Sequence, residues 1–122
     1  MRDMAGRLEN ELILVTGGSR GIGAAIVEKC LLEGANVSSI DLEEVEEATL
    51  LKKLNQDSKF LFVRGNVCSA EDLKRWSDNS RKRFGSINGL VNNAGRNSYA
   101  DPVTMTEQQW EDVFDVDLKA AW

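Results

Sequence analysis

A glycine-rich segment follows the first apolar run of the chain, and its spacing points to a ligand-binding turn. The segment reads Thr16-Gly-Gly-Ser-Arg-Gly-Ile-Gly23. Such a turn must reverse the chain sharply, let backbone approach a phosphate and bring a helix close to a strand, and glycines at 17, 21 and 23 suit those three needs. A helix that starts here would direct free N–H groups and the positive end of its dipole at a diphosphate. The segment therefore predicts a nucleotide site that includes Gly17, Gly21 and Gly23.

Other kinds of protein also use a glycine-rich turn after a strand, and the sequence allows each of them to be tested. A P-loop requires Lys and then Ser or Thr after its last glycine, whereas Gly23 is followed by two alanines, so ATP or GTP hydrolysis is not favoured. A methyltransferase that binds adenosylmethionine could use a glycine turn and an acidic residue after its second strand. It has no need of the later segment Asn92-Asn-Ala-Gly95. A glycine-rich turn that binds no ligand also remains open.

Asp41 is the candidate residue for the ribose of an adenosine. It lies 24 residues after Gly17, directly after a second apolar run. At the carboxyl end of a strand, a carboxylate can accept hydrogen bonds from both ribose hydroxyls and would repel a 2'-phosphate. Glu43 and Glu44 add negative charge nearby. NAD is therefore favoured over NADP, with Arg20 as the counter-argument because a cation in the turn could pair with a phosphate.

The composition excludes several kinds of chemistry. The 122 residues contain no histidine, which removes Ser-His and Cys-His catalytic pairs and imidazole-based metal sites, and no metal site is predicted. Cys30 and Cys68 lie 38 positions apart, so we expect two reduced, structural thiols. The net charge of -5 disfavours nucleic-acid binding, and the basic residues between 74 and 83 are expected on the solvated face of a helix.

Neither a membrane segment nor a secretory signal is expected. No apolar run approaches the roughly 20 residues of a membrane helix. Residues 1–11 carry charges of both signs and lack the apolar core of a signal peptide. The expectation is a cytoplasmic protein with no membrane partner.

Four apolar runs alternate with longer amphipathic stretches. The runs are continuous, which is typical of strands covered on both faces. They occupy residues 12–15, 35–40, 60–63 and 87–91. Helices are expected between them, over residues 22–34, 43–53 and 69–84. The apolar positions of the first helix are Ile22, Ala25, Ile26 and Cys30. This alternation predicts an α/β fold with a parallel sheet.

A last helix is predicted after Thr106, whose spacing to Gln109 matches a capping box. Its apolar positions are still in helical register at Trp122, where the sequence stops with no C-terminal glycine. We therefore expect residues 1–122 to be the N-terminal part of a single NAD(P)-binding Rossmann domain, truncated within a helix.

Two motifs together resemble those of the short-chain dehydrogenase/reductase family. They are the glycine segment 16–23 and Asn92-Asn-Ala-Gly95, and the similarity runs from about residue 6 to the last residue. The resemblance implies a Rossmann-type doubly wound parallel sheet, here incomplete with about four strands in the order 3-2-1-4. It also implies hydride transfer between a nicotinamide dinucleotide and a small-molecule alcohol, ketone or aldehyde. The complete protein would form a homo-oligomer.

The resemblance also implies which residues contact the cofactor. These are Ser19, Arg20 and Ile22 at the phosphates and ribose, Asp41 at the adenosine ribose, Asn66 and Val67 beside the adenine, and Asn93, Ala94 and Gly95 in the cleft after the fourth apolar run.

The sequence departs from the family pattern at several positions. Asn66 and Asn88 stand where Asp is common, and Asn66 keeps an acceptor for the adenine and gains a donor. Asp117 stands where the family has the Asn of its catalytic proton-relay group, and helical spacing puts it on one face with Trp110 and Val113. A buried carboxylate without a partner is costly. Either the partner of this carboxylate lies outside the sequence, or this helix face is less buried than its apolar residues suggest. Asp117 is a candidate catalytic residue.

The catalytic Ser and the Tyr-x-x-x-Lys motif of the family are not present. The only tyrosine is Tyr99, and Val103 stands four positions later. A tyrosine general acid needs a neighbouring cation that lowers its pKa from about 10, so Tyr99 is no substitute and is expected in a loop near the substrate side of the cleft. The sequence thus predicts an NAD-dependent oxidoreductase represented by its cofactor-binding half and inactive alone. The alternative is a dinucleotide-binding or interaction module without catalysis.

Overall fold

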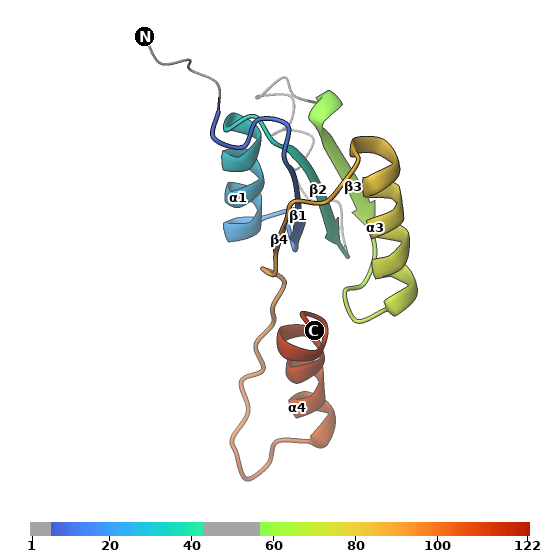
Figure 1. Ribbon diagram of the computed structural model, residues 1–122. Coiled ribbons are helices and arrows are strands. Elements are labelled where there is room, and N and C mark those ends of the chain that lie inside the picture. Colours follow the sequence, from blue (N-terminus) through green and yellow to red (C-terminus); the bar gives the residue numbers. More distant parts are fainter. Residues whose placement is uncertain (1–5, 43–56) are drawn as a thin grey trace.

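The computed structural model describes residues 6–42 and 57–122 (Figure 1). Its strands are β1 (Leu12–Thr16), β2 (Asn36–Asp41), β3 (Phe60–Arg64) and β4 (Gly89–Val91). Its α-helices are α1 (Gly21–Leu32), α3 (Ala70–Phe84) and α4 (Glu107–Phe114). A 3-10 turn, η1 (Asp57–Lys59), precedes β3, and a π-helix, η2 (Asp115–Lys119), follows α4. The helix expected over 43–53 lies outside the described residues.

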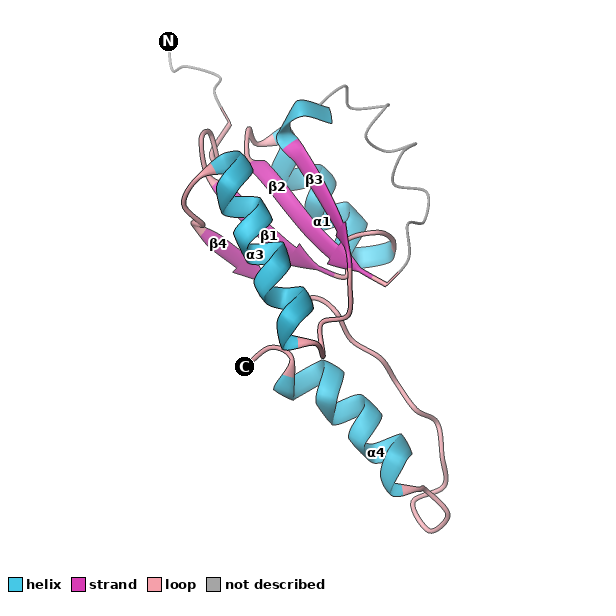
Figure 2. Cartoon of the chain, turned by 90° about the vertical axis from the view of Figure 1, so that its right-hand side faces the viewer, coloured by secondary structure: helices cyan, strands magenta, loops and turns pink. Residues whose placement is uncertain are grey.

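The strands form one parallel sheet in the order β3-β2-β1-β4. In the central strand β1, Val15 pairs with Ser39 of β2 on one side and with Val91 of β4 on the other. Figure 2 shows α1 covering one face of the sheet and α3 the other. This is the doubly wound, Rossmann-type arrangement and strand order that the sequence predicted, and the sheet is open at β4.

A separate apolar core fills each side of the sheet. Residues of β1 and β2 pack against α1 on one side, and Trp76 of α3 packs against the other. The buried residues of α1 are Gly23, Val27 and Leu31, which recur every four residues along one face. The expected apolar positions are therefore partly wrong, because Ile22 is 76% exposed and only Ile26 and Cys30 border the core.

The last helix is less regular than the sequence predicted. Its start is confirmed, because Thr106 and Gln109 form both bonds of a capping box. The α-helical register then ends at Phe114, and the following π-helical turn includes a bond from the N–H of Ala120 to the carbonyl of Asp115. A π-turn inserts one extra residue, so the apolar positions do not keep α-helical phase to Trp122. No helix of the described ranges 6–42 and 57–122 is long and apolar enough to cross a membrane.

Candidate functional site

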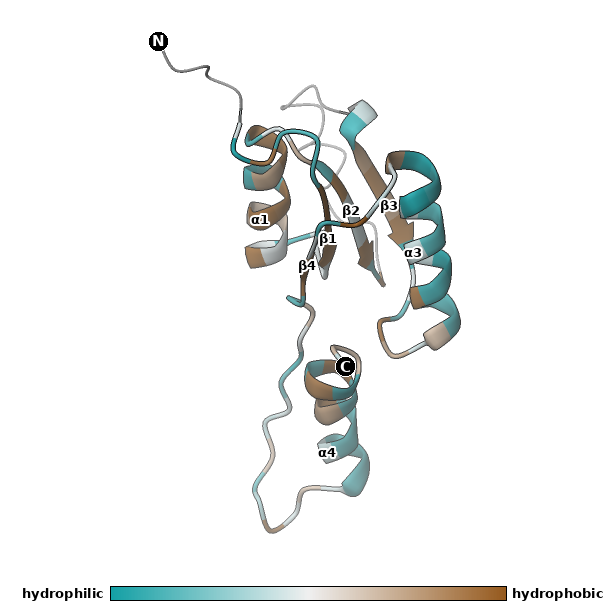
Figure 3. Ribbon diagram, viewed as in Figure 1, coloured by the Kyte–Doolittle hydropathy of each residue, from teal (hydrophilic) through white to brown (hydrophobic). Residues whose placement is uncertain are grey.

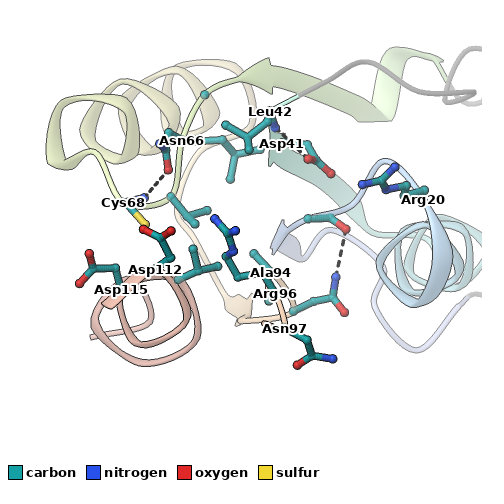
Figure 4. A pocket seen from close by; sticks show the side chains of 17 residues that line it. Arg20, Asp41, Leu42, Asn66, Cys68, Ala94, Arg96, Asn97, Asp112 and Asp115 are labelled. Atoms are coloured by element: carbon teal, nitrogen blue, oxygen red, sulfur yellow. Dashed lines mark hydrogen bonds between the residues drawn. The ribbon is translucent and has the colours of Figure 1, made fainter. Parts of the chain in front are cut away.

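A cleft of about 710 Å³ lies at the carboxyl ends of the strands, with α4 and η2 forming one wall (Figure 4). Open α/β sheets bind ligands at this edge, and the volume is typical of small-molecule and cofactor sites. The predicted site residues that line it are Gly17, Arg20, Asp41, Asn66, Val67, Asn93, Ala94 and Gly95. The cleft therefore joins segments that are far apart in the sequence.

Several predicted residues lie beside the cleft without lining it. Ser19 is buried in the turn, and Gly23 is buried in the first turn of α1. Gly21 borders open space at the start of α1, and the side chain of Ile22 is exposed to solvent. Asp117 lines a much smaller neighbouring pocket. The structure thus brings the glycine turn and the Asn93–Gly95 loop together.

Gly23 is the point where the turn and α1 approach most closely. A Cβ atom at this position would lie 2.0 Å from the carbonyl oxygen of Gly17 and 2.5 Å from Nδ2 of Asn93. Gly21 has a different reason for being glycine: its φ is +58°, and a Cβ there would meet nothing within 4 Å. Glycine at 23 therefore allows α1 to pack closely against the turn, whereas glycine at 21 leaves the space beside the turn unoccupied.

The N-terminus of α1 has no side-chain cap. Arg20 is the N-cap residue and makes no capping bond, and the first turn contains no acidic residue. By contrast, Ser69 caps α3 and Thr106 caps α4. The buried Oγ of Ser19 has no hydrogen-bond partner among the residues that the structure describes. Uncapped N–H groups at a helix N-terminus attract anions, so this turn is suited to a phosphate.

Asp41 is the last residue of β2, and backbone N–H groups hold its carboxylate at the edge of the cleft. Ser19 N donates to Oδ2 over 3.2 Å, and Leu42 N donates to Oδ1 over 2.8 Å. Each carboxylate oxygen can accept a further hydrogen bond. Asp41 is therefore oriented by the glycine turn and can still accept hydrogen bonds from a ligand.

Sequence reasoning missed Thr16, which joins the two loops of the site. Its hydroxyl is nearly buried and accepts hydrogen bonds from the N–H groups of Asn93 (3.0 Å) and Ala94 (2.9 Å). The side-chain Nδ2 of Asn93 donates in turn to the carbonyls of Thr16 and Gly17. A hydroxyl at the end of a strand, directly before a glycine turn, was the available signal. These bonds fix the loop after β4 against the turn after β1.

The predicted adenine side of the cleft contains a thiol. Asn66 Oδ1 accepts a hydrogen bond from Cys68 N over 2.8 Å, which orders the loop after β3. Cys68 is a free, exposed cysteine that lines the cleft, so the expectation of a structural thiol is wrong for it, whereas Cys30 is half-buried. Desolvation raises the pKa of Cys68, and the Asp115 carboxylate adds to that rise. The thiol is therefore protonated at neutral pH.

Asp117 is an exposed residue of η2 with a backbone partner. Its Oδ1 accepts a hydrogen bond from the N–H of Arg96 over 2.9 Å. The expected face with Trp110 is less buried than helical spacing suggested, because Trp110 is 52% exposed and no residue of α4 is buried. The carboxylate thus avoids the cost of burial and connects η2 to the cleft loop.

Three basic residues of α3 form ion pairs within that helix. Lys74 and Arg81 both pair with Asp78, and Arg75 pairs with Asp72. These side chains lie on the exposed face, as expected for a solvated helix. Within the described ranges 6–42 and 57–122, no group of three or more His, Cys, Asp or Glu side chains could hold a metal ion.

Comparison with known proteins gives a consistent result. The family model for short chain dehydrogenase matches residues 11–122. An uncharacterized oxidoreductase of Mycobacterium bovis is 38% identical over 121 residues, which are 98% of this chain and 48% of that protein. The dehydrogenase/reductase SDR family member 4 of Caenorhabditis elegans is 35% identical over 119 residues, which are 95% of this chain and 46% of that protein.

The solved structures agree with the sequence comparison. A short-chain dehydrogenase/reductase of Brucella melitensis, described as a glucose/ribitol dehydrogenase, superposes with a TM-score of 0.89 at 26% identity. The match covers 97% of this chain and 50% of that one. The chain therefore spans about half the length of the relatives that it matches.

Proposed function

The chain belongs to the short-chain dehydrogenase/reductase family, and from that membership we propose that its cleft binds NAD for hydride transfer between a small-molecule alcohol and a ketone or aldehyde. Members of this family are oxidoreductases that bind NAD(P). The finer statements, on NAD itself, on the residues that hold it and on turnover, are our proposals.

The uncapped turn at the start of α1 is the observation that carries the cofactor proposal. The free N–H groups of this turn would bind the diphosphate, and the Ser19 hydroxyl, which lacks a partner in the described part of the chain, would gain an acceptor. The open space at Gly21 leaves room for the phosphate oxygens. Bound in this way, NAD supplies the hydride acceptor, and the protein holds and orients it.

Asp41 supports NAD over NADP. Its carboxylate is held at the cleft edge and can accept hydrogen bonds from ribose hydroxyls, whereas a 2'-phosphate there would meet a like charge. We expect NADH to bind at least about tenfold more tightly than NADPH, a difference of about 1.4 kcal/mol. Asp41→Ala should reduce this preference in a binding titration of the intact protein. Equal affinity for both cofactors in the unmodified protein would contradict the assignment.

Asp117 supports catalysis as a positioning residue. Through the N–H of Arg96 it ties η2 to the loop that contains Asn93, Ala94 and Gly95. We propose that this bond maintains the separation between α4 and the cofactor loop. In the intact enzyme, Asp117→Asn keeps an acceptor oxygen and should retain most activity, whereas Asp117→Ala should lower kcat more than it changes the affinity for NADH.

Hydride transfer also needs a proton donor for the carbonyl oxygen, and Tyr99 does not fit that role. It is 94% exposed in the loop before α4, and no lysine stands four residues after it. We propose that the polypeptide 1–122 alone does not catalyse hydride transfer. The test is NADH oxidation with a panel of ketones and aldehydes, compared between this polypeptide and the intact protein. Turnover by residues 1–122 would contradict the proposal.

A second candidate function is a dinucleotide-binding module without catalysis. The uncapped turn before α1 and the carboxylate of Asp41 would serve such a module as well as they would serve an enzyme. It predicts that the intact protein binds NADH but does not oxidise it with any ketone or aldehyde of the same panel. We further propose a cytoplasmic homo-oligomer, for which cell fractionation and the mass of the purified protein in solution are the tests.

A further inference from the structure

Arg96 is a cleft residue that neither sequence motif includes. It directly follows Gly95 and lines the cleft, and its backbone N–H is fixed by Asp117. Its guanidinium makes no hydrogen bond or ion pair within the part of the chain that the structure describes. A positive, planar group therefore faces the cleft from a fixed backbone position.

The surroundings of Arg96 show which part of the cleft it faces. In Figure 4 its side chain rises from the loop beside Ala94 toward the side that carries Asn66 and Cys68, while Arg20 lies at the opposite end, near Asp41. Arg96 also acts electrostatically on the Cys68 thiol and lowers its pKa, opposing the effect of desolvation. The two cations thus lie at different ends of the cleft, with Arg20 at the turn and Arg96 beside the loop after β3.

We infer that Arg96 contacts the adenine of the bound dinucleotide by stacking its guanidinium on the face of the base. The inference rests on the proposed cofactor binding and on the family resemblance, which implies that Asn66 and Val67 lie beside the adenine. A guanidinium is planar and weakly hydrated, and it stacks on aromatic faces better than an ammonium does. The diphosphate is expected at the other end, on the turn before α1, so the base is the part of the ligand within reach of Arg96.

Binding of dinucleotide fragments tests this inference. The ligands are NADH, ADP-ribose and reduced nicotinamide mononucleotide, of which the last lacks the adenosine. Arg96→Met in the intact protein keeps the apolar stem and removes the stacking group. It should weaken NADH and ADP-ribose by about 5- to 10-fold, and leave the mononucleotide unchanged. Arg96→Lys should also weaken both adenosine ligands, because it keeps the charge and loses the plane.

Lys119→Met is the matched control, since this cation also acts on Cys68 but does not line the cleft. It should bind all three ligands like the unmodified protein, and thermal melting checks that each variant is folded. Three results would overturn the role of Arg96 while leaving the proposed cofactor binding in place. These are an unchanged NADH affinity in Arg96→Met, an equal loss of affinity for all three ligands, or the full unmodified affinity in Arg96→Lys. Failure of the unmodified protein to bind NADH would overturn the proposed function and this inference with it.

Discussion

The two walls of the cleft are built very differently. The wall formed by β1, the glycine turn and α1 belongs to the core, with Val15, Val27 and Leu31 almost fully buried. The wall formed by α4 and η2 has no buried residue, and its rings of Trp110 and Phe114 stack on each other half-exposed, with centroids 3.9 Å apart. Figure 3 shows the same contrast, with hydrophobic residues along the central strands and a mixture of hydrophilic and hydrophobic residues along α4.

This difference in burial means that different interactions determine the geometry of each wall. On the turn side, backbone bonds and close atomic contacts determine the geometry, so small changes there should affect both folding and binding. On the α4 side, no residue of the helix is buried, and a hydrogen bond from Arg96 N to Asp117 joins η2 to the cleft loop. Changes on the α4 side should therefore have smaller, more local effects.

The largest effect is expected for Gly23→Ala on the turn side. The new methyl group would lie 2.0 Å from the Gly17 carbonyl oxygen, so the turn and α1 must separate. We expect a loss of about 3 kcal/mol in the free energy of unfolding, together with loss of NADH binding. Urea denaturation measures the first and a titration the second. A stability within about 0.5 kcal/mol of the unmodified protein would show that the turn is not closely packed.

A smaller effect is expected for Asp117→Ala on the α4 side. The variant leaves the Arg96 N–H without its acceptor, and the site is exposed, so the loss of unfolding free energy should be about 1 kcal/mol. Hydrogen exchange at the Arg96 amide should become faster. Asp117→Asn is the matched control and should protect this amide nearly as well. Identical exchange in all three proteins would show that the bond does not form in solution.

Thr106→Ala tests the stability of α4 by itself. The substitution removes the hydroxyl that accepts the Gln109 N–H at the start of the helix. Loss of such a cap costs about 1 kcal/mol, and the low burial of α4 should confine the effect to that helix. Amide exchange should accelerate in α4 and stay unchanged in α1. An equal acceleration in both helices would mean that the two walls unfold as one unit.

The smallest effect is expected far from the cleft, at the N-terminal segment. Arg7 pairs with Glu33 through its guanidinium and its backbone N–H, and these bonds lower the pKa of Glu33 to about 2. A carboxyl with a depressed pKa stabilises the fold above its unfolded value near 4.5, and the contribution is lost as the pH falls toward 2. Arg7→Gln should flatten this part of the stability profile slightly. NADH affinity at pH 7 should stay unchanged, whereas a loss would connect this segment to the cleft.

Much of the fold could be predicted because its signals are local. Continuous apolar runs and the glycine turn predicted four parallel strands, and the family resemblance implied their order. Ser69 and Thr106 predicted two helix starts that the structure confirms. The π-turn at Asp115–Lys119 was not predicted, because the apolar positions Trp110, Val113 and Ala120 also fit an uninterrupted α-helix.

The site was harder to predict in detail. Motif residues such as Gly17 and Asn93 line the cleft, but Thr16 and Arg96 depend on how two loops meet in space. The burial of Cys68 was wrongly expected from the general behaviour of free cysteines, since its exposure depends on the loop after β3. Sequence spacing thus identified the segments of the site better than the contacts between them.

The most direct test of the central claim is the affinity of the intact protein for NADH in two glycine variants. Gly21→Val places a side chain in the open space on the turn, and Gly85→Val places one in equally open space at the end of α3, also at a positive φ. Both substitutions put a β-branched side chain at a positive φ and should lower stability, so thermal melting must show that each variant is folded at the temperature of the titration. We predict that Gly21→Val abolishes saturable NADH binding and that Gly85→Val retains the unmodified affinity. Unchanged binding in a folded Gly21→Val protein would contradict the proposed site.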